Sequence, residues 1–137
     1  MRVNGGRVIA ISAEKLSGTK FEGYDVSIQI TDLKETDKHI EIHFDHATSY
    51  RVDFAKMSIK GIVNAEAEDK ERKKIIEDWK KTKQLPNEAA EEVLMAINYI
   101  TSTVGTLMAF AINVNAPVNV PRTRIMNLPG QPENKAG

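Results

Sequence analysis

The segment VLMAINYITSTVGTLMAFAINV, residues 93–114, carries the most information about this fold, because none of its residues is charged. Asn87 and several glutamates precede it, and these residue types favour the start of a helix. We therefore predict a helix from Asn87, as its capping residue, to about Ile112. At 1.5 Å per residue this helix would be roughly 39 Å long, which is unusual for a small domain.

Apolar residues recur along one side of this predicted helix in alternating steps of four and three, which predicts contact with a sheet or a partner helix. They are Val93, Ile97, Ile100, Val104, Leu107 and Ala111. The other side is also uncharged and rich in small residues, which lets a second backbone approach closely. We therefore predict a contact between subunits on that side; burial within the chain's own domain is the alternative. The predicted interface residues are Asn98, Tyr99, Ser102, Gly105, Thr106 and Ala109.

The same segment is as long as a membrane span, so a membrane helix is a rival interpretation. Polar residues within it, such as Asn98 and Asn113, and the lack of a basic flank at either helix end count against a span. Residues 1–6 contain no apolar region typical of a secretory signal. We therefore expect a cytoplasmic protein without a membrane partner.

Four stretches before the helix alternate apolar and polar residues in the way that strands do. They are residues 7–15, 24–31, 39–46 and 50–63. The short links between them, at 32–38 and 47–49, favour an antiparallel meander with one face covered. The alternation in the last stretch shifts by one residue at Ala55–Lys56, which predicts a β-bulge or bend.

Residues 68–84 link the strands to the long helix and are dense in charge, with Ile75, Ile76 and Trp79 as the apolar stripe. This pattern predicts an amphipathic helix that ends before Pro86. Trp79 either fills the core or anchors a partner. The chain is therefore predicted to be an α+β domain: a four-stranded antiparallel sheet, a charged crossover helix and a long C-terminal helix.

The composition excludes several classes of function. The 19 basic residues balance the 19 acidic ones, so there is no overall basic charge typical of nucleic-acid binding. The chain has no cysteine, which excludes disulfides and thiolate chemistry. Phosphate-binding glycine loops and the GxSxG motif are absent from the sequence. We therefore predict that the protein is not an enzyme and needs no cofactor.

One strand carries a possible metal-binding pattern. Residues His39, Glu41, His43 and Asp45 all project from one face of HIEIHFDH, and neighbours two apart on a strand can share a metal. A third ligand with supporting spacing does not appear elsewhere in the sequence. The alternative is the hydrated outer face of a sheet that is apolar on its other side. We therefore predict no metal site.

The order of the predicted elements resembles that of the bacterial export chaperone SecB family. The closest local similarity is ITSTVGTLMAFAINVNAPVN, residues 100–119, which is similar to the end of that family's long helix and to the Asn-Leu-Ala-Pro-Val-Asn-like loop after it. AKMSIKGIV, residues 55–63, is similar to the family's last long strand. The charged segment 68–84 departs from the family, which has an aromatic, glycine-containing loop there.

This resemblance implies a single SecB-like α+β domain over residues 1–126. The proline content and terminal position of residues 127–137 predict a flexible Pro-rich tail in place of the family's short C-terminal helix. The resemblance also implies a tetramer, a dimer of dimers, with the long helices packed between the pairs. The activity it implies is ATP-independent holding of unfolded chains in apolar grooves near the crossover segment and the extended loop.

The residues themselves suggest where polypeptides would bind. Val114, Val118 and Val120 lie in a segment that prolines keep extended, where an extended client could contact backbone and side chains; packing over the sheet edge is the alternative. Ile76 and Trp79 are further candidates. We therefore expect an ATP-independent holdase or adaptor for polypeptide clients that forms a homodimer or tetramer. A membrane-associated protein and a metal-binding protein remain the alternatives.

Overall fold

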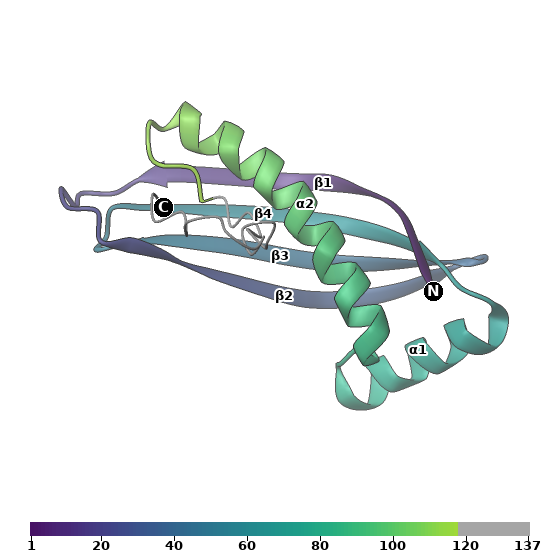
Figure 1. The fold of residues 1–137 in the computed structure, drawn as a ribbon. Helices are drawn as coiled ribbons and strands as arrows, with labels where there is room; N and C mark the ends of the chain where they lie inside the picture. Colours follow the sequence, from purple (N-terminus) through teal and green to yellow (C-terminus); the bar gives the residue numbers. More distant parts are fainter. Residues whose placement is uncertain (118–137) are drawn as a thin grey trace, which may run out of the picture.

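The computed structural model describes residues 1–117, in which four strands are followed by two helices (Figure 1). The elements are β1 (Arg2–Lys15), β2 (Gly23–Thr36), β3 (His39–Arg51), β4 (Ala55–Glu66), α1 (Asp69–Thr82) and α2 (Asn87–Ala111). The strands form one antiparallel sheet, so the predicted α+β fold with a charged helix and a long helix is confirmed. Residues 127–137, the predicted tail, lie outside the described part.

The order of strands in the sheet is β1-β4-β3-β2, which differs from a simple meander. Tight turns join β2 to β3 and β3 to β4, whereas β1 pairs with the free edge of β4. The link between β1 and β2 therefore crosses the end of the sheet. It is held there by backbone hydrogen bonds to the β3–β4 turn, such as Gly18 N to Asp53 O at 2.8 Å.

Two predicted turns are in the wrong place. The charged segment 32–38 belongs mostly to β2, and only Asp37–Lys38 form the turn, with Asp37 in the left-handed region (φ 47°). The predicted turn at 47–49 lies inside β3, and the real turn is at 52–54. The shift in alternation near Ala55 therefore marks the end of a hairpin turn rather than a bulge within one strand.

The sheet has one covered face and one open face, because residues paired across antiparallel strands project to the same side. On the covered face, one row across the sheet joins Val8, Gly61, Phe44 and Ile30. The next row on that face is Ile11, Ile59, His46 and Ile28, followed by Ala13, Met57, Thr48 and Val26. The buried core lies between this face and the helices.

Helix α2 crosses the covered face diagonally and packs mainly against β1 and β4 (Figure 1). Its buried residues follow steps of four, with Met108 beside them: Ala89, Val93, Ile97, Thr101, Gly105 and Ala109. A row with steps of four is inclined to the helix axis, so the contact line turns around the helix. Leu107 and Ala111, the last two residues of the stripe predicted to contact a sheet or a partner helix, therefore lie off the sheet-facing line and are exposed.

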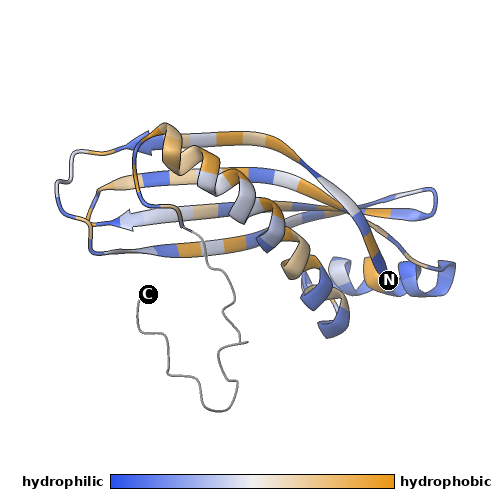
Figure 2. Cartoon of the chain, turned by 45° about the horizontal axis from the view of Figure 1, so that its top comes forward, coloured by the Kyte–Doolittle hydropathy of each residue, from blue (hydrophilic) through white to orange (hydrophobic). Residues whose placement is uncertain are grey.

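The bounds of both helices agree with the prediction, but the cap of α2 does not. Pro86 occupies the capping position and Asn87 is already helical, without a side-chain cap bond. Helix α1 lies beside one end of the sheet, near the β2–β3 hairpin, and is mostly hydrophilic, whereas α2 is mostly apolar after its first turns (Figures 1 and 2). Ile75 and Trp79 anchor α1 in the core.

Candidate functional site

The most exposed large apolar side chains of α2 form a row on its solvent side, which we call the outer row. These side chains are Met95 (73% exposed), Tyr99 (78%), Leu107 (65%) and Phe110 (71%), and the exposed Thr103, which lies between them, completes the row. Steps of four and three place them on one side of the helix. No charged side chain interrupts α2 after Glu92. Burying each large member would contribute about 1.5–3 kcal/mol, so the row favours contact with protein.

The polar groups within this helix do not make its surface hydrophilic. The hydroxyl of Thr103 donates to the carbonyl of Tyr99 at 3.1 Å, and that of Thr106 donates to Ser102 at 2.7 Å. Thr101 donates to Ile97 at 2.8 Å in the same way. Because the helix backbone already satisfies these donors, contact with a partner would leave none of these hydroxyl groups without a hydrogen bond.

The interface predicted from the sequence is only partly on the exposed side. Asn98 and Tyr99 are exposed, Ser102 and Thr106 are half-buried, and Gly105 and Ala109 are buried within the chain. A Cβ atom at Gly105 would lie 3.6 Å from Cγ of Pro117. Gly105 and Ala109 are therefore buried within their own chain, which corrects their predicted place in a subunit contact, whereas the contact predicted for the other four residues stays a prediction. The outer row was visible in the sequence as uncharged large residues at steps of four.

A second apolar surface lies at the end of the sheet where β3 turns into β4. Four rings, Phe21, Tyr24, Tyr50 and Phe54, form the aromatic cluster. The ring centroid of Tyr50 is 5.8 Å from those of both Phe21 and Tyr24, which is within the range of favourable aromatic pairs. Phe21 is 38% exposed. The cluster therefore presents part of an aromatic surface to solvent.

Tyr50 links this cluster to the segment that follows α2. Its hydroxyl donates to the backbone carbonyl of Asn115. Burial, with a smaller contribution from Tyr24, raises the pKa of Tyr50 to about 12. The hydroxyl therefore stays protonated and keeps donating at neutral pH.

The aromatic cluster continues along β2 as an apolar row on the covered face, which we call the β2 row: Tyr24, Val26, Ile28 and Ile30. None of these four residues is fully buried: Val26 is 42% exposed, and the other three are half-buried. β2 is also an edge strand, paired only with β3 in the described part of the chain. Its free edge offers backbone donors and acceptors beside apolar side chains.

The predicted polypeptide-binding residues are not brought together. Trp79 lies on the buried side of α1, with the Lys83 ammonium 5.5 Å from the centre of its ring. Ile76, on the same helix, is half-buried. Val114 is half-buried in the segment directly after α2, and the C-terminal end of α2 lies at the opposite end of the sheet from α1 (Figure 1). Val118 and Val120 lie outside the described residues. Trp79 is thus a core residue and not an exposed anchor.

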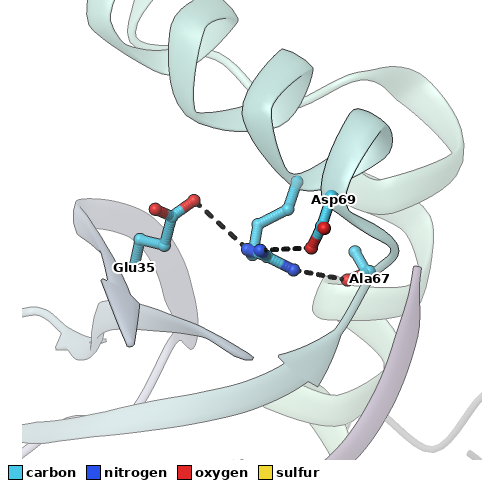
Figure 3. A network of polar contacts seen from close by, with 4 residues as sticks. Glu35, Ala67 and Asp69 are labelled. Carbon is cyan, nitrogen blue, oxygen red and sulfur yellow. Dashed lines mark hydrogen bonds and ion pairs between the residues drawn. The ribbon is translucent and has the colours of Figure 1, made fainter. Parts of the chain in front are cut away.

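A network around Arg72 holds α1 to the sheet (Figure 3). The Arg72 guanidinium contacts the Glu35 carboxylate on β2 at 3.2 Å, that of Asp69 at 2.7 Å and the Ala67 carbonyl at 2.9 Å. The hydrogen bond from Arg72 lowers the pKa of Asp69. Because every nitrogen of the guanidinium has a partner, this network is structural and offers no free cation to a ligand.

The polar pattern on β3, from His39 to Asp45, lies on the open face of the sheet. Among residues 1–117, no group of three or more His, Asp or Glu side chains is placed to hold a metal. The Glu41 carboxylate accepts a hydrogen bond from Arg7 at 3.2 Å and lies 3.7 Å from Nε2 of His43. A cation at Glu41 would have to displace Arg7.

Helix α2 is long and apolar enough to cross a membrane by length and composition, although 33% of its most apolar window is buried within the chain. Insertion would require the helix to leave the sheet and expose the core positions Val93 and Ile97.

Comparison with protein-family models, with curated proteins and with solved structures finds no match to this chain.

Proposed function

We propose that this chain is a self-associating, polypeptide-binding protein: an ATP-independent holdase or adaptor of the SecB-like type. The observation that carries the proposal is the outer row of α2, which is uncharged, apolar and exposed on a chain whose other helix is densely charged. Isolated apolar residues on a surface need no explanation, but a continuous row of this size is typical of a protein contact.

A second copy of the chain is the simplest partner for the outer row. The row is nearly symmetric about Thr103, with Met95 and Tyr99 on one side and Leu107 and Phe110 on the other. Two antiparallel copies of α2 related by a two-fold axis at Thr103 would therefore place apolar side chains opposite each other. The small Thr103 at the centre allows the helices to approach closely.

The client site is the aromatic cluster together with the β2 row. An extended polypeptide could pair with the free edge of β2 through its backbone and place apolar side chains against Val26 and Phe21. Backbone pairing does not depend on sequence, which suits a protein that binds many unfolded chains. Neither step uses ATP or a catalytic group.

The test measures whether the full chain suppresses aggregation of a chemically unfolded reporter protein without ATP. Val26→Asp should weaken suppression, because it places a charge in the β2 row, whereas Ser27→Asp adds the same charge to the open face of the same strand. We expect wild type and Ser27→Asp to act alike. If the wild-type chain neither suppresses aggregation nor binds the unfolded reporter, the proposal is wrong.

A further inference from the structure

The apolar side of β2 does not end with the β2 row. After a shift in register between Ile30 and Asp32, Leu33 returns to the covered face, where it pairs with Ile42 of β3. Leu33 is only 8% exposed, whereas Val26 within the β2 row is 42% exposed. The same apolar edge is therefore open to solvent at one end of β2 and covered at the other.

Helix α1 covers that second end. It packs against β2, whereas α2 packs mainly against β1 and β4. Its buried side chains Ile75 and Trp79 belong to the same apolar cluster as Leu33. The Arg72 guanidinium also reaches the carboxylate of Glu35, two residues beyond Leu33 on the same side of the strand (Figure 3). The apolar edge of β2 therefore continues beneath α1.

The attachment of α1 can be released without separating any strands. Only three side chains of this helix are buried: Arg72, Ile75 and Trp79. The carboxylate that Arg72 contacts on β2 belongs to the exposed residue Glu35, so water can replace this contact. Short non-helical links at residues 67–68 and 83–86 flank the helix. An element with few buried contacts opens more readily than the sheet that it covers.

We propose that the client site continues beneath α1 and that a bound polypeptide reaches Leu33 by displacing this helix; the inference rests on the proposed function. At about 3.3 Å per residue, the β2 edge from Tyr24 to Ile30 is roughly 20 Å long, and extending it to Leu33 makes it roughly 30 Å. An extended client segment of about ten residues would fill the longer site. Because α1 must first be displaced, the apparent affinity for such a client depends on the fraction of molecules in which the helix is open.

A covalent lock on α1 tests this inference in the full chain. Because the sequence has no cysteine, the double variant Glu35→Cys with Arg72→Cys carries only two thiols. The native side chains meet at 3.2 Å, so a short bismaleimide can join the thiols and hold α1 against β2. The matched control is the same variant with both thiols capped by N-ethylmaleimide, in which α1 is free to move. The measurement is the affinity of each form for a tryptophan-free unfolded polypeptide that carries a fluorescent label.

The capped form should bind the unfolded polypeptide about tenfold more tightly than the locked form, because burying one leucine side chain changes an affinity by about that factor or more. In wild type, saturation with the polypeptide should shift the emission of Trp79 to longer wavelength, since displacement of α1 exposes its ring. Equal, measurable affinity of the locked and capped forms, or an unchanged Trp79 spectrum in saturated wild type, would overturn the inference alone. If neither wild type nor either form binds the polypeptide, the proposed function is wrong and the inference falls with it.

Discussion

At the scale of single residues, Gly61 shows how one missing side chain shapes the core. It lies in the centre of the sheet, and a Cβ atom there would be 2.7 Å from the Phe44 ring and from the backbone carbonyl of Arg7. The edge of the Phe44 ring therefore occupies the space that a side chain at this position would fill, and Phe44 is fully buried.

Gly61→Ala should destabilise the fold by about 1–3 kcal/mol, because the added methyl group forces the Phe44 ring or β1 to move. Denaturant unfolding of the purified protein measures this change. Combining Gly61→Ala with Phe44→Leu should cost less than the sum of the two single substitutions, since the smaller side chain leaves room for the methyl group. Additive costs would show that the ring is not what the methyl group meets.

His46 makes the stability of the fold depend on pH. It is buried between Ile28 and Ile59 on the covered face, and this burial lowers the pKa of His46 below its ordinary value of 6.5. The folded protein therefore binds fewer protons here than the unfolded chain, and stability falls as the pH drops from 6.5 through the lowered pKa. Thermal unfolding between pH 7.5 and 5.5 should show this decline. This loss of stability should be smaller in His46→Leu than in wild type. An equal loss in both proteins would show that other titratable groups cause it.

At the scale of elements, α1 is attached to the rest of the chain by few side chains. Ile75 and Trp79 supply its buried apolar contact, and Arg72 connects it to Glu35 on β2. Most of the other residues of the helix are charged and exposed. The Arg72 network therefore determines where α1 sits against the sheet.

Arg72→Met should loosen α1, because Glu35 and the Ala67 carbonyl both lose their partner. Trp79 is the only tryptophan in the chain, so its fluorescence reports on this helix alone. We expect a shift to longer wavelength and stronger quenching by acrylamide. Lys74→Met, at an exposed position of the same helix, should leave both signals as in wild type. Identical spectra for Arg72→Met and wild type would contradict the role of the network.

At the scale of the whole molecule, residues 1–117 leave one side of the longest helix among them, α2, without a cover. The sheet buries one side of α2, from Ala89 to Ala109, and the outer row projects on the side away from the sheet. The described part of the chain has no further element for that side. Assembly of two copies through α2 would bury it without changing the fold.

Tyr99→Asp should weaken self-association at least about tenfold, because replacing a central aromatic residue of a contact costs about 2 kcal/mol or more. Asn98→Asp adds the same charge one position away, at the rim of the row, and should have a much smaller effect. Analytical ultracentrifugation over a range of concentrations measures both. A wild-type chain that sediments as a monomer in detergent-free buffer would contradict the assembly, and a chain soluble only in detergent would favour the membrane alternative.

The sequence by itself determined the type and the order of the elements, four alternating stretches followed by a charged helix and an uncharged helix, because each pattern is local, but it misplaced two of the turns between strands. Only the tertiary structure decided that β1 pairs with β4, since alternation shows which side a residue faces but not which strand lies beside it. It also decided that Gly105 faces Pro117 and Leu107 faces solvent. The diagonal crossing of α2 over the sheet turns the contact line around the helix, and this crossing angle depends on residues far apart in the chain.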